Sequence, residues 1–280
     1  MLNILKAVLF GVVQGITEWL PISSTGHMIL LNEFIRLEVS PEFWQIFLVV
    51  IQFGSIIAVV ILFWSKIFPF DFSERAKKRG TIVKKETLRL WGYVLIACIP
   101  AAVVGILFDD VLDELFYHWY IVAIALIVFG VLFIVVENKV CQKPRIRHLR
   151  QIKWKDALYI GFFQLIAAVF PGTSRSGATI IGGRMIRFER AVAAEFTFIL
   201  AIPVMFGASL LKLMKYGFSF SGDEALILTV GMVTAFAVSL VVIKSLMKFI
   251  KTHGFKVFGW YRIVLGIAVI VYFGFLHKAA

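Results

Sequence analysis

The stretch GVVQGITEWLPISSTGHMI at residues 11–29 recurs in outline 150 residues later as GFFQLIAAVFPGTSRSGAT, residues 161–179. The identical pairs at this offset include Gly11 and Gly161, Gln14 and Gln164, Pro21 and Pro171, and Ser24 and Ser174. Each copy is an apolar stretch, about 3–34 and 154–183, interrupted in its middle by Pro, Ser, Thr and Gly. This pattern predicts two helix-loop-helix hairpins that enter a membrane and return, because non-helical backbone at membrane depth needs protein or a water-filled cavity around it.

The composition indicates a membrane protein. Hydrophobic residues make up 60% of the 280 residues and charged residues only 16%, and 28 residues are Phe. A water-soluble fold exposing that much apolar surface would aggregate. The sequence therefore excludes an ordinary soluble domain.

Six further stretches are long and apolar enough to cross about 30 Å of hydrocarbon at about 1.5 Å per residue. They run approximately over 43–64, 88–108, 119–136, 191–213, 225–247 and 257–276. With the two hairpins, they predict an all-α polytopic membrane protein of six transmembrane helices, as a single membrane domain over residues 1–280.

The basic residues predict the orientation. Four connections, 64–89, 138–156, 184–190 and 244–256, hold 22 of the 29 Lys and Arg residues. By the positive-inside rule these connections face the cytoplasm and both termini lie outside. The net charge of +12 is then a topology signal rather than a sign of nucleic-acid binding.

The repeat predicts two halves of opposite orientation. Each hairpin is followed by three spans, and an odd number of crossings turns the second copy upside down. The inverted-topology repeats are expected at about residues 1–137 and 152–280. At the 150-residue offset the two copies differ in their ionisable residues: Glu18 aligns with Ala168, Thr25 with Arg175 and His27 with Gly177. We therefore expect one asymmetric site formed by the two similar hairpins.

The first hairpin carries an acid and hydroxyls. Gln14 and Glu18 are four residues apart, so both project from one helix face. A second half-helix is expected to open at Ser23, Ser24 and Thr25, with His27 in its first turn. Hydroxyls and free N–H groups at a helix N-terminus favour an anion.

The second hairpin repeats this arrangement with Thr173, Ser174 and Ser176 and adds the guanidinium of Arg175, whose planar fork suits phosphate. Each polar residue has a simpler alternative. Glu18 could be a buried structural acid, His27 a helix-packing residue and Arg175 a snorkelling residue. The hydroxyls of Ser23, Ser24 and Thr173 could be helix caps. However, an ionisable residue at the bilayer centre costs about 2.5–3.5 kcal/mol, and here three lie near the breaks of the two repeats.

The motifs Gln14-Gly15-Ile16-Thr17-Glu18, Pro21-Ile22-Ser23-Ser24-Thr25-Gly26-His27 and Pro171-Gly172-Thr173-Ser174-Arg175-Ser176-Gly177 resemble those of the bacterial undecaprenyl-pyrophosphate phosphatase family, also called bacitracin-resistance proteins. The resemblance covers essentially the whole chain. It implies an enzyme of the bacterial inner membrane that removes the terminal phosphate of a C55 polyprenyl pyrophosphate, regenerating the carrier of cell-wall synthesis. It also implies a divalent cation and a site facing the outer leaflet.

The resemblance assigns roles by motif. Gln14 and Glu18 take the positions of the metal-binding pair, although other members have Glu at the first; an amide oxygen can also bind Mg²⁺ or Ca²⁺. Arg175, with N–H groups near Thr173 and Ser174, is expected to stabilise the transferring phosphoryl group. Ser24, His27 or a water attacks, and His27 is the expected general base. The sequence does not choose among these nucleophiles.

One other function class fits the repeats. Inverted repeats with broken helices also build transporters, so a transporter or flippase of polyprenyl phosphate is the alternative. The acid, base and nucleophile all lie on the first hairpin, which favours hydrolysis. Small residues such as Gly105, Gly130 and Gly207 permit close helix packing within the chain or in a homodimer. Glu195 and Arg262 are expected to be interfacial anchors.

Overall fold

The computed structural model describes residues 1–73, 82–116, 118–139, 143–217 and 220–276, and these are helical with no strand beyond two isolated β-bridges. The described residues form α1 (Leu2–Thr17), α2 (Ser24–Phe34), α3 (Pro41–Leu62), α4 (Trp64–Ile67), α6 (Lys85–Phe116), α7 (Trp119–Lys139), η1 (Leu149–Gln151), α8 (Trp154–Val169), α9 (Arg175–Met185), α10 (Arg190–Tyr216), α11 (Gly222–Thr252), α12 (Lys256–Val271) and η2 (Tyr272–Leu276). Parts of the basic connections 64–89 and 138–156, and the last four residues, lie outside this description.

The six predicted spans are confirmed as long apolar helices. Among the described residues, six helices are long and apolar enough to cross a membrane, with mean hydropathies from 1.8 to 3.0. They are α3, α6, α7, α10, α11 and α12. The chain is therefore a multi-pass membrane protein of helical fold.

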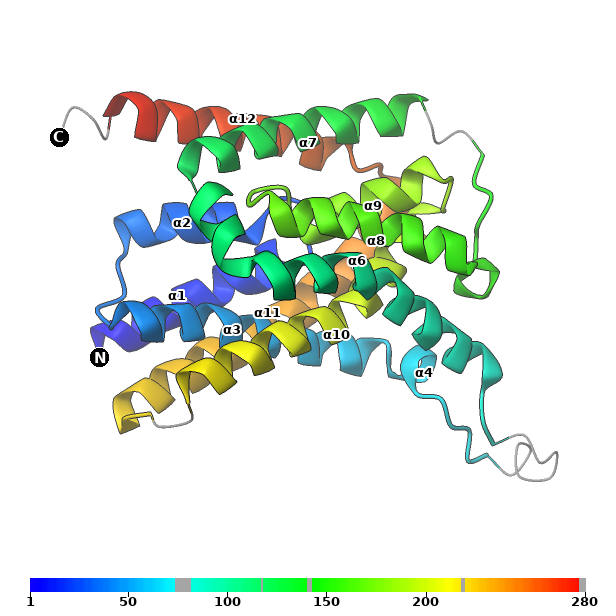
Figure 1. The fold of residues 1–280 in the computed structure, drawn as a ribbon, viewed down its shortest axis with the longest axis horizontal. Coiled ribbons are helices and arrows are strands. Elements are labelled where there is room, and N and C mark those ends of the chain that lie inside the picture. The colour runs from blue at the N-terminus through cyan, green and yellow to red at the C-terminus, as the bar shows by residue number, and fades with distance from the viewer. Residues whose placement is uncertain (74–81, 117, 140–142, 218–219, 277–280) are drawn as a thin grey trace.

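The two ends of the molecule differ in what they carry. Figure 1 shows the start of α1 and the end of η2 at one end. The helix ends that lead into the four basic connections all lie at the opposite end, where α4, α7, α9 and α11 finish. The segregation of the basic connections to one end is what the charge pattern of the sequence predicts.

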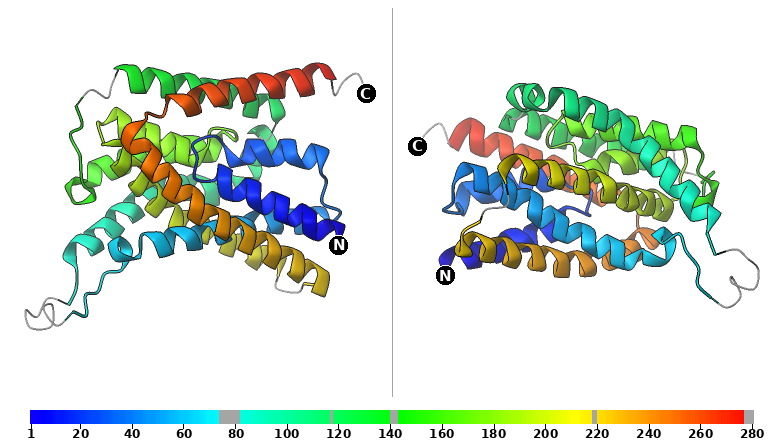
Figure 2. Two further views of the ribbon diagram at one scale, coloured as in Figure 1. Left: turned by 180° about the vertical axis from the view of Figure 1, so that it is seen from behind. Right: turned by 60° about the horizontal axis from the view of Figure 1, so that its bottom comes forward.

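Four helices are too short to cross a membrane alone. α1 and α8 have 16 residues each and α2 and α9 have 11 each. At about 1.5 Å per residue these lengths reach about 24 Å and 17 Å, less than the about 30 Å of a hydrocarbon core. α1 and α2 start and finish at the end that holds the N-terminus, and α8 and α9 at the other end (Figures 1 and 2), so the two loops approach each other inside the molecule.

The short helices pack against spans from the other half of the chain. α1 lies along α11 and α8 lies along α6, while α3 pairs with α10 and α7 with α12. Glycines allow the close approach. A Cβ added to Gly11 would lie 2.6 Å from the Gly231 carbonyl oxygen, and one added to Gly161 would lie 2.6 Å from that of Ala97. No larger residue fits either position without a shift of the backbone.

A buried ion cluster attaches α9 to its neighbours. Glu137 of α7 accepts from the Nε of Arg184 at 2.8 Å and from the Nη2 of Arg190 at 2.7 Å, and its side chain is 1% exposed. Because a buried charge must be paired, these contacts fix the far end of α9 between α7 and α10. The N-terminal end of α9, at Arg175, is therefore held in a fixed position relative to α7 and α10.

Candidate active site

Two serines begin the second helix of each hairpin in the same way. Ser23 and Ser174 are the N-caps of α2 and α9, with φ of 74° and 68°. Their hydroxyls accept from the N–H groups of Gly26 at 3.3 Å and Gly177 at 3.2 Å. Left-handed φ is uncommon for a residue with a side chain, so two such caps at matching places show one local design used twice.

This geometry corrects the alignment of the two loops. The sequence comparison places Ser24 opposite Ser174 and Thr25 opposite Arg175, but the caps pair Ser23 with Ser174. From the shared proline to the cap, the first loop advances two residues (Pro21 to Ser23) and the second advances three (Pro171 to Ser174), so the first loop is one residue shorter there than the simple offset assumes. Consequently Ser24 and Arg175, the first residues of α2 and α9, occupy equivalent positions.

Ser24 and Arg175 converge on the carboxylate of Glu18. The Ser24 hydroxyl donates to Oε2 at 2.9 Å, and the Arg175 Nη2 donates to Oε1 at 2.8 Å. Gln14 also donates its amide to Oε2, at 2.9 Å, as expected for residues four apart on one helix face. The structure thus brings four of the predicted site residues into one network.

Burial makes this network energetically important. The Glu18 side chain is 8% exposed and that of Arg175 15%. Removing one partner of such a pair typically costs about 3–5 kcal/mol, because the other charge stays buried. Ser176 donates to the Glu18 main-chain oxygen at 3.2 Å, and Arg175 also reaches the Met205 sulfur at 3.2 Å. These contacts hold the charged groups in fixed positions.

A small cavity of about 220 Å³ lies beside the network. It is lined by six predicted site residues: Glu18, Ser24, Thr25, Ser174, Arg175 and Ser176. Gln52 of α3 also lines it. The first N–H groups of α2 and α9 have no acceptor within their own helices. A cavity that receives two helix N-termini and a guanidinium suits an anion.

His27 lies outside this cavity lining. Its Nδ1 lies 2.7 Å from the Ser23 main-chain oxygen, and its Nε2 lies 2.7 Å from the Tyr261 hydroxyl. A carbonyl oxygen only accepts, so Nδ1 carries the hydrogen and Nε2 accepts from Tyr261. Among the described contacts His27 has none with Ser24, whose hydrogen-bond acceptor is Glu18. The role of His27 as general base stays a prediction.

Ser23 and Thr173 are buried behind the cavity lining. Ser23 is 1% exposed and acts as a cap, which is the simpler of its two interpretations. Thr173 is 0% exposed, and its hydroxyl has no hydrogen-bond partner among the described residues. Neither side chain lines the cavity. A direct contact of Ser23 or Thr173 with a ligand stays a prediction.

Comparison with known proteins places the chain in a family. Residues 7–268, which include the whole network and both caps, match the family described as "Bacitracin resistance protein BacA". The chain belongs to the BacA family.

The similarity to individual BacA family proteins extends over nearly their whole length. The chain is 58% identical over 274 residues to a protein of Desulfitobacterium hafniense named undecaprenyl-diphosphatase, covering 98% of this chain and 97% of the relative. A protein of Clostridium acetobutylicum named undecaprenyl-diphosphatase 1 is 58% identical over 273 residues, covering 97% and 98%. A protein of Enterococcus faecalis named undecaprenyl-diphosphatase is 55% identical over 271 residues, covering 96% and 97%.

Arg262 of this BacA family member is the site residue that sequence reasoning missed. It is fully buried, which contradicts its prediction as an interfacial anchor. Its guanidinium donates to the carbonyl oxygens of Pro21 at 3.3 Å, Gly172 at 2.9 Å and Thr173 at 2.8 Å. Arg262 therefore ties the loops of both hairpins together. Its only signal in the sequence is a charge inside the otherwise apolar stretch 257–276.

Glu195, the other predicted anchor, lies far from this network. Its carboxylate is paired with Lys66 at 2.6 Å, and the two side chains are 17% and 44% exposed. A partly exposed pair of this kind is typical of a surface contact. Glu195 thus has no part in the cavity beside Glu18.

Proposed function

We propose that the chain is an undecaprenyl-diphosphatase. It would hydrolyse undecaprenyl pyrophosphate to undecaprenyl phosphate and inorganic phosphate, recycling the lipid carrier of cell-wall synthesis and giving bacitracin resistance. The observation that carries the proposal is the convergence of Ser24 and Arg175 on the two oxygens of Glu18 beside the small cavity. The names of the family and of the full-length relatives support it.

The size of the cavity supports a lipid substrate whose head alone enters. At about 220 Å³ the cavity is smaller than the about 300–1,000 Å³ typical of sites that enclose a whole small molecule. Val204, Met205 and Ala208 form an apolar part of its lining. The pyrophosphate would occupy the polar side, and the prenyl chain would stay among the membrane lipids.

The hydrogen bonds suggest how the reaction proceeds. Ser24 donates to Glu18, so the carboxylate can accept a proton as the Ser24 oxygen, or a water in its place, attacks the terminal phosphorus. The anhydride bond to the terminal phosphate breaks, and undecaprenyl phosphate leaves. A water nucleophile gives inorganic phosphate directly, whereas attack by Ser24 leaves the phosphoryl group on its oxygen until a water hydrolyses that ester and releases phosphate. Arg175 and the N–H groups at the start of α9 would stabilise the charge on the phosphoryl oxygens. His27 remains the alternative nucleophile and base.

A divalent cation, Mg²⁺ or Ca²⁺, fits the donor chemistry of Gln14 and Glu18. The described residues bring no three His, Cys, Asp or Glu side chains together as a complete metal site. One or two carboxylates are nevertheless the usual protein share of a Mg²⁺ site whose other ligands are substrate phosphates and water, and an amide oxygen is a hard ligand of the same kind. Such a cation would neutralise charge on the pyrophosphate.

We also propose that α1–α2 and α8–α9 are re-entrant hairpins of inverted-topology repeats in the bacterial inner membrane. Their equal helix lengths and their positions at opposite ends support this. By the positive-inside rule the hairpin with Glu18 would open to the outer leaflet, and both termini would lie outside. A homodimer stays a prediction. Gly105 and Gly207 have nothing within 4 Å of an added Cβ and are free for such packing, whereas Gly130 packs against Gly259.

Phosphate release from long-chain polyprenyl pyrophosphate by the purified protein in detergent tests the function. Release should require divalent cation, stop on addition of chelator, and fall by at least about 1,000-fold in Glu18→Ala and in Arg175→Ala. Glu195→Ala is the matched control, because Glu195 is a partly buried acid outside the cavity. No release by well-folded wild-type protein would refute the enzyme and favour the transporter, which vesicle assays of prenyl-phosphate movement would then detect.

A further inference from the structure

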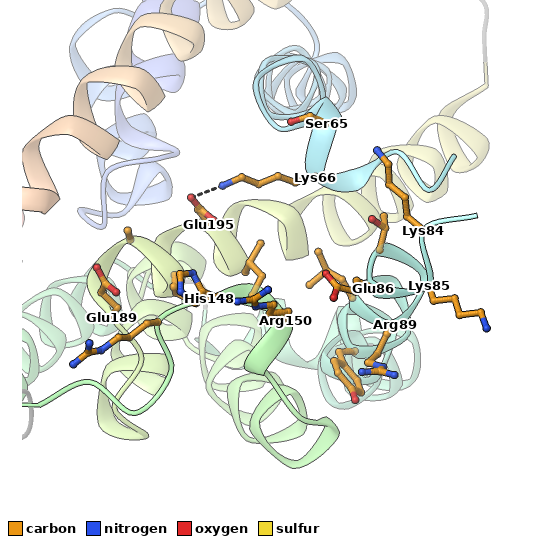
Figure 3. A pocket seen from close by; sticks show the side chains of 17 residues that line it. Ser65, Lys66, Lys84, Lys85, Glu86, Arg89, His148, Arg150, Glu189 and Glu195 are labelled. Atoms are coloured by element: carbon orange, nitrogen blue, oxygen red, sulfur yellow. Dashed lines mark hydrogen bonds and ion pairs between the residues drawn. The ribbon is translucent and has the colours of Figure 1, made fainter. Parts of the chain in front are cut away.

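A second and larger cavity lies at the end of the molecule that carries the basic connections. Its volume is about 1180 Å³, and it is bounded by α4, the start of α6, the segment around η1 and the start of α10 (Figure 3). None of its lining residues belongs to the hairpin loops that form the cavity beside Glu18. The proposed phosphatase reaction does not use this cavity.

The charges around this basic cavity are unbalanced. The lining contains three acids and six cations, Lys66, Lys84, Lys85, Arg89, Arg147 and Arg150, which leaves a net charge of 6 − 3 = +3. One acid, Glu195, is already paired with Lys66 at 2.6 Å. A hollow with surplus positive charge concentrates anions.

Two of the cations extend toward the cavity without a hydrogen-bonded side-chain partner among the described residues. Lys84 and Arg150 come from opposite sides of the basic cavity and extend toward it, whereas the ammonium group of Lys85 points away (Figure 3). Within the described part of the chain, the side chains of Lys84 and Arg150 make no hydrogen bond, and Lys84 interacts electrostatically with the nearby carboxylate of Asp71. A lysine and an arginine offer a point charge and a planar fork, the two donor types that bind phosphate.

Exposed aromatic side chains beside the basic cavity indicate its depth in the membrane. Trp64, the neighbour of the lining residue Ser65, is 51% exposed, and Phe70 and Phe72 are 42% and 62% exposed. Trp64 stacks on Phe68 with ring centroids 4.6 Å apart. Exposed tryptophans such as Trp64 are enriched at the level of the lipid headgroups. The cavity is therefore placed to meet a lipid rather than only dissolved ions.

We propose that the basic cavity binds the phosphate group of an anionic membrane lipid through Lys84 and Arg150. The lipid would come from the leaflet that faces the basic connections, and its acyl chains would lie against the exposed aromatic rings. Basic pockets at this edge of membrane proteins recognise anionic headgroups in general. Free phosphate shares the same chemistry, and the aromatic cluster is what favours the lipid.

Native mass spectrometry of the purified protein with phosphatidylglycerol, and with phosphatidylcholine as the neutral comparator, tests the proposal. Each basic residue near a membrane surface contributes about 1 kcal/mol, or about fivefold in affinity. Lys84→Gln/Arg150→Gln should therefore weaken phosphatidylglycerol binding about 30-fold. The matched control Lys248→Gln/Lys251→Gln removes two exposed charges from α11 at the same end of the molecule and should change binding less than twofold.

Three results would overturn the proposal. Equal weakening in both double variants would mean that only the general surface charge matters. Unchanged binding in Lys84→Gln/Arg150→Gln would remove both residues from the site. Full displacement of the lipid by millimolar inorganic phosphate would assign the cavity to a soluble anion. Phosphate release at the wild-type rate reports correct folding, and the single variants, each expected to lose about fivefold, serve if the double variant unfolds.

Discussion

The two hairpins share a backbone but differ in their chemistry. Each has a 16-residue helix, a loop ending in a serine cap with left-handed φ, and an 11-residue helix. The first contributes the acid Glu18 and the hydroxyl of Ser24, and the second contributes the guanidinium of Arg175. At the equivalent first helical position one hairpin thus has a hydroxyl and the other a cation, and both side chains contact the same carboxylate.

This difference shows what a duplicated scaffold offers. The repeat supplies two N-termini aimed at one region, and a few substitutions make that region asymmetric. The acid comes from one side only, so Ser24 and Arg175 approach it from opposite hairpins and use different oxygens. The cavity therefore combines two helix N-termini with one acid, whose two oxygens face different partners.

The sharpest test of this asymmetry is an exchange of the two first-turn residues. The double variant Ser24→Arg/Arg175→Ser conserves the charge and the composition of the cavity. We expect phosphate release to fall at least about 1,000-fold, because Glu18 does not move with the exchange and the guanidinium no longer faces it from the second hairpin. Steady-state rates measure this. Activity within tenfold of wild type would show that the hydroxyl and the guanidinium are functionally interchangeable between the two positions.

Within the first hairpin, Ser24 and His27 compete for the role that activates the attack. Ser24→Ala should lower the rate by about 100- to 10,000-fold, the usual range for a positioned nucleophile or proton donor. His27→Ala should lower it less, because His27 is bonded to Ser23 and Tyr261 rather than to Ser24. Rates and pH profiles of both variants distinguish the roles. A larger loss in His27→Ala would make the histidine the base or the nucleophile.

Arg262 couples the hairpins, and its replacement should affect both at once. Arg262→Lys keeps the charge, but a single ammonium group cannot bond all three carbonyls of Pro21, Gly172 and Thr173. A carbonyl left without a partner costs about 1–3 kcal/mol, and displaced loops lower the rate by about 100-fold. Thermal unfolding and kcat are the measurements. An unchanged unfolding temperature would contradict the role of Arg262 in holding the two hairpin loops together.

The smallest expected effects come from the two serine caps, which form a matched pair. Ser23→Ala and Ser174→Ala should each destabilise the protein by about 1 kcal/mol, whereas glycine, which accepts left-handed φ, should cost only a few tenths. Only Ser174 lines the cavity, so only Ser174→Ala should also change KM. Denaturant unfolding and kinetics test both points. A change of KM in Ser23→Ala would show that Ser23 also affects substrate binding, although it does not line the cavity.

The spans could be predicted from sequence because each is a long apolar run. Gln14, Glu18, Ser24 and Arg175 could be predicted because two repeated motifs mark them. The equivalence of Ser24 and Arg175 could not, since one residue in a loop shifts the register and only the cap geometry reveals it. Arg262 could not either. Its partners are main-chain oxygens of Pro21 and Gly172, and a carbonyl carries no signal in the sequence.

The side of the membrane that each hairpin faces is predicted from the charges in the connections, by the positive-inside rule. The basic end is visible in the fold, but the leaflet it faces is an inference from Lys and Arg counts. By contrast, the imidazole of His27 contacts Tyr261 of α12 rather than Ser24. Nothing in the local pattern of Ser23 to His27 indicates that contact.

The separation of Glu18 from its partners along the chain has a consequence for biosynthesis. Arg175 follows Glu18 by 157 residues, and Arg262 belongs to the last of the six spans. A growing chain therefore makes its acid long before the guanidinium that pairs with it, and in general an unpaired charge near a bilayer centre costs about 2.5–3.5 kcal/mol. The first hairpin should stay near the water until α9 has been translated, and the site becomes complete only as synthesis ends.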